Sequence, residues 1–146
     1  MIVVVDQSNI ETAAGIHSIA WQDSHRAFCS RDFIEKHTPA RQRNYLQAKL
    51  DHGSKLFMLI AKEPVGIVSV TESLIEDLYV LPEQQNKGYG TALLRFAISE
   101  CKATPTLWIL ENNVNAARLY RRLGFEETGR RNQITNKLDE IEFARP

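Results

Sequence analysis

The chain has 146 residues, and 18 lysines and arginines balance 18 aspartates and glutamates, so its formal net charge is zero. This length fits a single domain, residues 1–146, that can bury a core without disulfides or a structural metal. Balanced charge gives no broad attraction to nucleic acid or to an anionic membrane, and no apolar run approaches the roughly 20 residues that cross a bilayer. Cys29 and Cys101 form no CxxC pair and no metal-ligand cluster. We therefore expect reduced thiols in a cytoplasmic protein without a metal, a nucleic-acid partner or a membrane partner.

The first fifty residues predict one strand and two helices. Residues 2–5 are all β-branched, which is typical of a buried strand. Ser8 and Glu11 have the spacing of a capping box, which predicts a helix with Ser8 as its N-cap. Apolar side chains then recur at helical spacing: Ile10, Ala13, Ala14, His17 and Trp21. Thr38 followed by Pro39 is typical of a second helix start, and Gly53 suits a left-handed position after its end.

The middle of the chain changes to a strand pattern. Residues 56–61 and 65–70 predict an antiparallel hairpin that turns at residues 62–64. Residues 74–81 predict a third strand, which Pro82 ends.

The last third predicts two more helices and three more strands. Strands are expected at residues 106–110, 125–130 and 134–143, and Gly124 closes the second of the two helices. The apolar positions of the two helices are Leu93, Leu94, Ala97, Ile98 and Cys101 in the first, and Ala116, Leu119, Tyr120 and Leu123 in the second. This order predicts a mixed α/β fold in which antiparallel strands precede a parallel strand–helix–strand unit.

A polar, glycine-containing loop joins the predicted strand 74–81 to the following helix. Gly88 and Gly90 would let backbone N–H groups turn inward, and the helix would add the positive end of its dipole at the same point. Lys87 could add a cation. This arrangement is typical of a pyrophosphate site. Two glycines alone favour a flexible turn over such a site, and neither the Rossmann pattern nor the Walker pattern is complete here.

At this point the sequence resembles the GNAT superfamily of N-acetyltransferases. Gln85, Gly88 and Gly90 match the family's pyrophosphate motif of Gln or Arg, two residues, Gly, one residue, then Gly or Ala. The run from Asn115 through Leu119-Tyr120 to Gly124-Phe125 resembles its second coenzyme motif. The two motifs occur in the family's order and separation, and the resemblance covers residues from about 56 to 130.

The resemblance implies a central, mostly antiparallel mixed sheet, flanked by about four helices, in which two parallel strands splay apart. It implies acetyl-CoA as cosubstrate, with the pantetheine arm paired to the backbone of Leu78 and Val80 in the opening. The Val80 N–H would polarise the thioester carbonyl, and Asn115 would fix the pantetheine arm. The pyrophosphate would be held by Gln85, Asn86, Lys87, Gly88, Tyr89, Gly90 and Thr91.

Two side chains are candidates for the chemistry that the resemblance implies. Tyr120 occupies the position at which family members commonly place a tyrosine that protonates the departing thiolate; its spacing alone favours a core residue. Glu76 is the candidate base, because spermidine/spermine acetyltransferases carry a similar Glu-Asp pair and use the glutamate. Strand residues alternate, so Glu76 and Asp77 are expected to face opposite ways, and a solvated carboxylate or a base acting through water stays open.

The acceptor is left open between polyamine, antibiotic, amino acid, peptide N-terminus and protein lysine. Trp21, His25, Arg26 and Phe28 are expected to cluster after the first helix, where the family shapes its acceptor pocket; Trp21 fits the core and His25 the surface equally well. Ribosomal-protein acetyltransferases place a glutamate on the fifth strand where this chain has Leu110, and Glu111 should face the other side. The alternative functions are transfer of a different acyl group and a non-catalytic acyl-CoA sensor. A homodimer is also possible.

Overall fold

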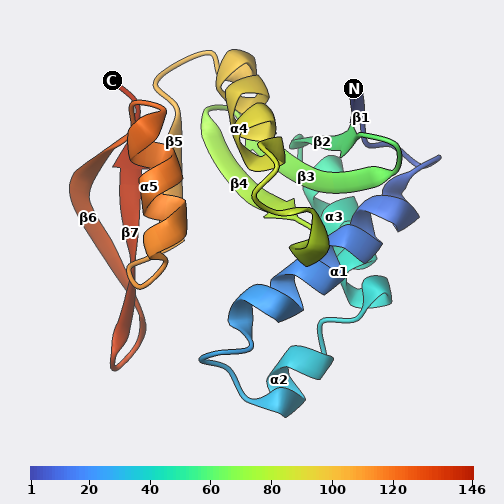
Figure 1. Cartoon of the computed structure of the whole chain (residues 1–146), viewed down its shortest axis with the longest axis horizontal. Helices are drawn as coiled ribbons and strands as arrows, with labels where there is room; N and C mark the ends of the chain where they lie inside the picture. Colours follow the sequence, from blue (N-terminus) through green and yellow to red (C-terminus); the bar gives the residue numbers. More distant parts are fainter.

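A seven-stranded sheet runs through the computed structural model, which describes all residues 1–146 (Figure 1). The strands follow the order β1-β2-β3-β4-β5-β7-β6, and every neighbouring pair is antiparallel except β4 with β5. Their bounds are β1 Ile2–Val4, β2 Lys55–Ile60, β3 Pro64–Thr71, β4 Leu74–Val80, β5 Thr106–Leu110, β6 Glu126–Thr135 and β7 Leu138–Ala144.

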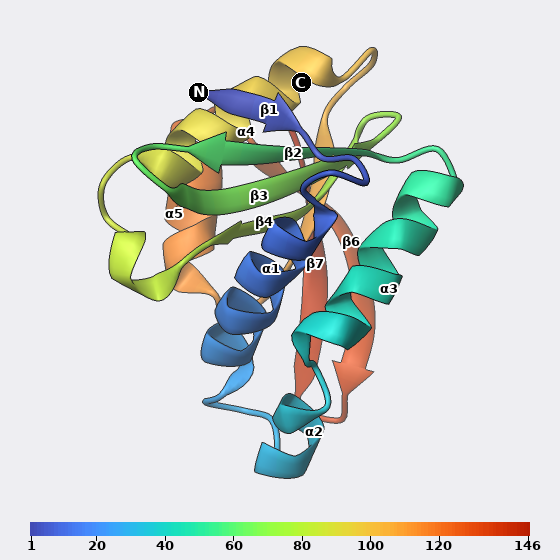
Figure 2. The ribbon, with the colours of Figure 1, turned by 90° about the vertical axis from the view of Figure 1, so that its right-hand side faces the viewer.

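Five α-helices and one 3-10 turn accompany the sheet, with α1 and α3 on one side of the strands β2 to β4 and α4 on the other (Figure 2). None of these helices is both long and apolar enough to span a bilayer. Their bounds are α1 Ile10–His25, α2 Arg31–Glu35, α3 Pro39–Asp51, η1 Pro82–Gln84, α4 Tyr89–Glu100 and α5 Val114–Arg122.

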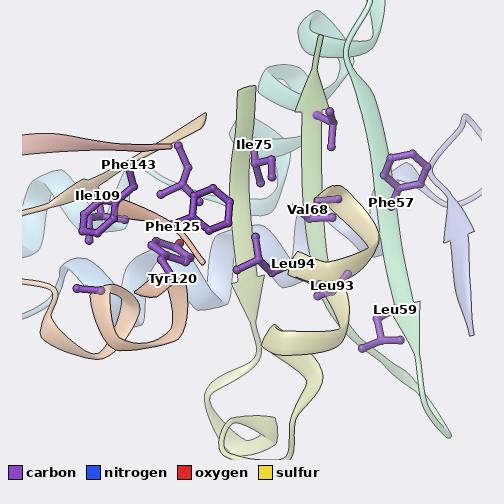
Figure 3. Close-up of a cluster of buried hydrophobic side chains, with 14 of the residues drawn as sticks. Phe57, Leu59, Val68, Ile75, Leu93, Leu94, Ile109, Tyr120, Phe125 and Phe143 are labelled. Carbon is purple, nitrogen blue, oxygen red and sulfur yellow. The ribbon is translucent and has the colours of Figure 1, made fainter. Parts of the chain in front are cut away.

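The alternation of side chains along β2 divides the core into two layers. Leu56 and Met58 pack with residues of α1 and α3, whereas Phe57 and Leu59 pack with residues of α4. The second layer continues across β5 and β7 to α5, where Tyr120 lies beside Phe125 and Phe143 (Figure 3). A sheet covered by helices on both faces explains why β2 and β3 read as continuous apolar runs.

The parallel strands β4 and β5 separate almost as soon as they meet. Their ladder contains one pair, Leu74 with Thr106, although both strands continue beyond it. The expected opening between two parallel strands is therefore present. It leaves the backbone of β4 after Leu74 without a ladder partner on the β5 side.

Most predicted elements are confirmed, and one predicted cap is wrong. Thr38 caps α3 by accepting from the Arg41 N–H, and Gly53 follows that helix at a φ of +93°. The N-cap of α1 is Asn9 rather than Ser8, because the Ser8 hydroxyl donates back to the Asp6 carboxylate. The capping box is absent, since Glu11 pairs instead with Arg43.

One further helix and the division between the last two strands also differ from the sequence prediction. The helix α2 was not predicted, because a helix of five residues carries no apolar repeat. The strand β6 continues through Thr135, so Ile134 belongs to β6 and not to the last strand. Every residue of β6 is exposed, which leaves its sequence without the alternation that marks a half-buried strand.

Candidate active site

A cavity of about 710 Å³ lies where β4 and β5 diverge. Residues of the end of α1 and its following loop, of β4 and β5, of α5 and the loop before it, and of β6 and β7 line this cavity. The structure brings together in this lining the predicted residues Glu76, Leu78, Val80, Gln85, Asn115 and Tyr120. The predicted residues from Asn86 to Thr91 lie outside the lining, in the loop and first turn that lead into α4.

A bulge in β4 shapes this cavity. Ile67 and Ser69 of β3 are two positions apart, whereas their partners on β4, Tyr79 and Glu76, are three positions apart. The extra residue is accommodated by Asp77, whose φ is +54°, a left-handed conformation that aspartate adopts more readily than most residues.

The bulge overturns the expectation that Glu76 and Asp77 face opposite ways. Both carboxylates accept hydrogen bonds from the same ammonium, Lys49 Nζ, at 3.0 Å from Glu76 and 2.6 Å from Asp77. Alternation holds only for a regular strand, and the left-handed residue breaks it here. The two side chains still differ in burial, since that of Glu76 is 44% exposed and that of Asp77 is 8% exposed.

Asp77 is the centre of a buried polar network that sequence reasoning missed. Its oxygens accept from the hydroxyls of Ser69 at 2.9 Å and Tyr45 at 3.0 Å, and His17 Nε2 lies at 3.2 Å. The amide nitrogen of Gln42 faces the other nitrogen of His17 at 2.6 Å. If this amide donates, His17 Nδ1 accepts, and Nε2 then carries the hydrogen that it donates to Asp77.

This network changes the acidity of its members. Burial opposes ionisation of Asp77, but the hydrogen bond from His17 and the charge of Lys49 outweigh it and lower the pKa of Asp77 below its usual range. Burial, followed by the negative charge of Asp77, raises the pKa of Tyr45. Asp77 is therefore a carboxylate whose hydrogen-bonding capacity is already taken up within the chain.

Tyr120 belongs to the core and to the cavity at once. Its residue is 8% exposed, and its ring packs against Phe125 and Phe143 at centroid distances of 6.0 Å and 6.2 Å. Its side chain lines the cavity, yet its hydroxyl has no hydrogen-bond partner within the chain. Burial raises the pKa of Tyr120 to about 12, so the phenol keeps its proton at neutral pH.

The glycine loop places the N-terminus of α4 beside the end of β4. Gly88, at a φ of +86°, is the N-cap residue of α4 and has no side chain to occupy the first N–H groups of that helix. Gln85 donates its side-chain amide to the Val80 carbonyl at 3.1 Å, which fastens the loop to the strand. The Lys87 ammonium, at 3.1 Å from the Gln84 side chain, is exposed.

The aromatic cluster expected after the first helix lies partly within it. Trp21 and His25 occupy the last turns of α1, and the Trp21 ring is stacked between His25 at 3.9 Å and His37 at 3.5 Å. His25 and Phe28 line the cavity, whereas Trp21 and Arg26 do not. Burial lowers the pKa of His25, which keeps its imidazole neutral at pH 7.

Several lining residues have no local sequence signal. Among them are Asp23 and Ser24 near the end of α1, Trp108 on β5 and Glu140 on β7. They come from three stretches far apart in the sequence that only the fold brings together. Leu110 lines the cavity, whereas Glu111 lies just after the end of β5, pairs with Arg131 and does not line it.

Comparison with known proteins adds to this geometry. Residues 53–127 match the family model described as an acetyltransferase (GNAT) domain. Over 68 residues the chain is 31% identical to the peptidyl-lysine N-acetyltransferase YjaB of Salmonella typhimurium. That match covers 47% of this chain and 46% of the relative, so it spans less than half the length of this curated protein.

Two solved structures share the fold over nearly the whole chain. The apo form of YjaB from Escherichia coli superposes with a TM-score of 0.77 at 20% identity, covering 99% of this chain and 96% of that one. The PaiA N-acetyltransferase of Thermoplasma acidophilum, in complex with coenzyme A, superposes with a TM-score of 0.73 at 17% identity, covering 100% and 98%. At these identities the likeness establishes the fold.

Proposed function

Because the chain belongs to the GNAT family of acetyltransferases, we propose that it transfers an acetyl group from acetyl-CoA to a primary amine. The observation that carries this proposal is the opening between β4 and β5. Their single ladder pair leaves β4 backbone unpaired at a cavity that Glu76 and Tyr120 both line. An extended pantetheine arm can enter such an opening and pair with the backbone as an added strand would.

In this proposal, the cosubstrate is held mainly by backbone groups. The pantetheine arm pairs with Leu78 and Val80, Asn115 fixes that arm, and the Val80 N–H polarises the thioester carbonyl. The pyrophosphate lies at the N-terminus of α4, where uncapped N–H groups and the helix dipole favour an anion. The residues proposed around it are Gln85, Asn86, Lys87, Gly88, Tyr89, Gly90 and Thr91.

The proposed reaction is a direct attack within a ternary complex. The amine nitrogen forms a bond to the thioester carbon, and the bond from that carbon to sulfur breaks. Glu76, directly or through a water, receives the proton that the amine loses, because an alkyl ammonium of pKa about 10.4 must first be deprotonated. Tyr120 donates a hydrogen bond or its proton to the departing sulfur.

The acceptor and setting of the reaction are part of the same proposal. The name of the YjaB relative supports a lysine side chain as one acceptor, and a small primary amine fits the same chemistry. We place the reaction in the cytoplasm, because Cys29 and Cys101 are free thiols, which are typical of a reducing compartment. We also propose that residues 1–146 act as one domain, which can form a homodimer.

Release of coenzyme A tests this proposal. Acetyl-CoA and the protein are incubated with a panel of primary amines and lysine peptides, and the free thiol is measured over time. Acetyl transfer predicts amine-dependent thiol release together with the acetylated amine. Acetyl-CoA binding without release for any acceptor would favour an acyl-CoA sensor instead, and absence of binding would contradict the proposal entirely.

A further inference from the structure

The charged side chains that line the cavity are all carboxylates. They are Asp23 near the end of α1, Glu76 and Asp77 on β4, and Glu140 on β7. No lysine or arginine lines the cavity, although the chain as a whole has equal numbers of acidic and basic residues. The negative charge is thus local to this cavity and does not reflect the overall composition.

Only part of this negative charge is compensated within the chain. Lys49, outside the lining, is shared between Glu76 and Asp77. Arg26 lies 3.2 Å from Asp23, but both side chains are well exposed, so the pair is weak. Glu140 forms no ion pair and accepts only the side-chain amide of Asn132, at 3.1 Å.

The remaining titratable groups of the lining add no positive charge at neutral pH. Burial lowers the pKa of His25 and raises that of both Tyr79 and Tyr120, so all three side chains are neutral. Tyr120 also carries a separate indication that this cavity receives a ligand. Its residue is 8% exposed and lines the cavity, and its hydroxyl forms no hydrogen bond within the chain and stays accessible to a ligand.

From these observations we propose that the acceptor is at least dicationic, which extends the proposed acetyl transfer and rests on it. One ammonium group reacts beside Glu76, where the single charge of Lys49 is shared by two carboxylates. A second ammonium or guanidinium, several bonds away in the same acceptor, pairs with the uncompensated carboxylate of Glu140. An acceptor that carries an anionic group in place of this second cation is repelled by the negative charge of Glu140.

A matched series of five-carbon amines tests the proposal. Cadaverine, 5-amino-1-pentanol and 5-aminopentanoate present the same reactive amine with an ammonium, a hydroxyl or a carboxylate at the far end. With saturating acetyl-CoA at low ionic strength, we expect kcat/KM to fall about five- to tenfold at each step from cadaverine to 5-aminopentanoate. A lysine peptide flanked by arginines, compared with one flanked by glutamates, distinguishes a peptidyl source of the same dication from a small diamine.

Two variants locate the effect. Glu140→Gln should bring the ratio of kcat/KM for cadaverine over 5-amino-1-pentanol towards one, whereas Glu111→Gln, which changes a carboxylate outside the cavity, should keep that ratio. Equal kcat/KM across the series would overturn the dicationic acceptor while acetyl transfer stands. Acetyl-CoA binding without turnover of any dication, in either the diamine or the peptide arm, would also overturn it. A protein that does not bind acetyl-CoA would instead contradict the proposed function.

Discussion

The Tyr120 phenol is a weak acid, and its environment makes it weaker. With a pKa raised to about 12, it is a poorer proton donor than a thiol of pKa about 8.5 is. Complete proton transfer to a thiolate is therefore uphill, and in the proposed reaction the hydroxyl would act mainly through a hydrogen bond that strengthens as charge develops on sulfur. We accordingly expect an effect at the low end of the range for general acid catalysis.

Tyr120→Phe tests this role. The ring packing against Phe125 and Phe143 is retained, so stability and acetyl-CoA affinity should change little, while kcat falls about 10²-fold. Tyr79→Phe is a matched control, since Tyr79 also lines the cavity with its pKa raised by burial. Steady-state kinetics measures the change in kcat, and calorimetry measures the affinity for acetyl-CoA. Full activity of Tyr120→Phe would leave this residue with a packing role alone.

At the level of single residues, sequence reasoning reached those that a motif marks. Gln85, Asn115 and Tyr120 all line the cavity as expected. The direction of Asp77 was wrong, because no local pattern announces a left-handed aspartate within a strand. Nor could spacing reveal His17 as a partner of Asp77, since the two residues are 60 positions apart and meet only after α1 packs on β4.

Among the elements, β4 depends most on its polar network, because the bulge is held by hydrogen bonds to α1, α3 and β3. Asp77→Asn keeps a residue that tolerates a positive φ but removes the charge that faces Lys49, whose side chain is 12% exposed. Breaking a buried ion pair costs several kcal/mol, and Glu76 still pairs with Lys49, so we expect a loss of about 2–3 kcal/mol at pH 7. Urea unfolding measures this loss.

The pH dependence of that loss has a defined sign. A lowered pKa in the folded state means that Asp77 contributes stability above its unfolded pKa of about 3.9, and that this contribution disappears as the pH falls towards the folded value. The stability gap between wild type and Asp77→Asn should be constant from about pH 5 to 8 and should narrow below about pH 4. Asp139→Asn, which affects a partly exposed pair with Arg131, should show a much smaller gap. A gap independent of pH would mean that the charge of Asp77 contributes nothing.

The start of α4 allows folding and anion binding to be separated. A side chain at Gly90 has room, since the atom nearest to an added Cβ is Leu119 Cδ2 at 3.7 Å. Gly90→Glu adds a carboxylate to the first helical turn, which the helix dipole favours, but this charge repels a bound pyrophosphate. Compared with the neutral Gly90→Gln, we expect about tenfold weaker acetyl-CoA binding with unimpaired thermal stability. Equal affinities of the two variants in calorimetry would place the pyrophosphate elsewhere.

The sequence predicted the bounds of an element best where that element is well buried or has a clear cap. The start of α3 was predicted from Thr38 and Pro39, and the whole of β5 was predicted to the residue. The start of α1 was misread because the Ser8 hydroxyl and N–H both donate to the Asp6 carboxylate, and the hydroxyl accepts no N–H of the helix. Local patterns cannot decide such competition between two partners of one hydroxyl.

At the scale of the whole molecule, the sheet divides into two segments that are joined by a single ladder pair between β4 and β5. The strands β1 to β4 lie on one side of the opening and β5 to β7 on the other, with Leu74 and Thr106 as the only ladder pair between them. The apolar cluster of α4 and α5 continues beneath both segments and holds them together (Figure 3). A ligand that pairs with β4 inside the opening should therefore stabilise the entire fold and not one element alone.

Acetyl-CoA should accordingly raise the melting temperature of the whole chain. At 100 times its dissociation constant, a ligand that binds only the folded state adds about 2.7 kcal/mol. For a chain of this size, that corresponds to a shift of roughly 8 °C in differential scanning calorimetry.

Amide exchange should slow at Leu78 and Val80 and at the start of α4, because the pantetheine arm and the pyrophosphate are proposed to bind there. A single shifted transition with this protection supports binding in the opening. A raised melting temperature with amide protection confined to the exposed strand β6 would place the ligand outside the opening. A melting transition that millimolar acetyl-CoA does not move would contradict acetyl-CoA binding by this chain.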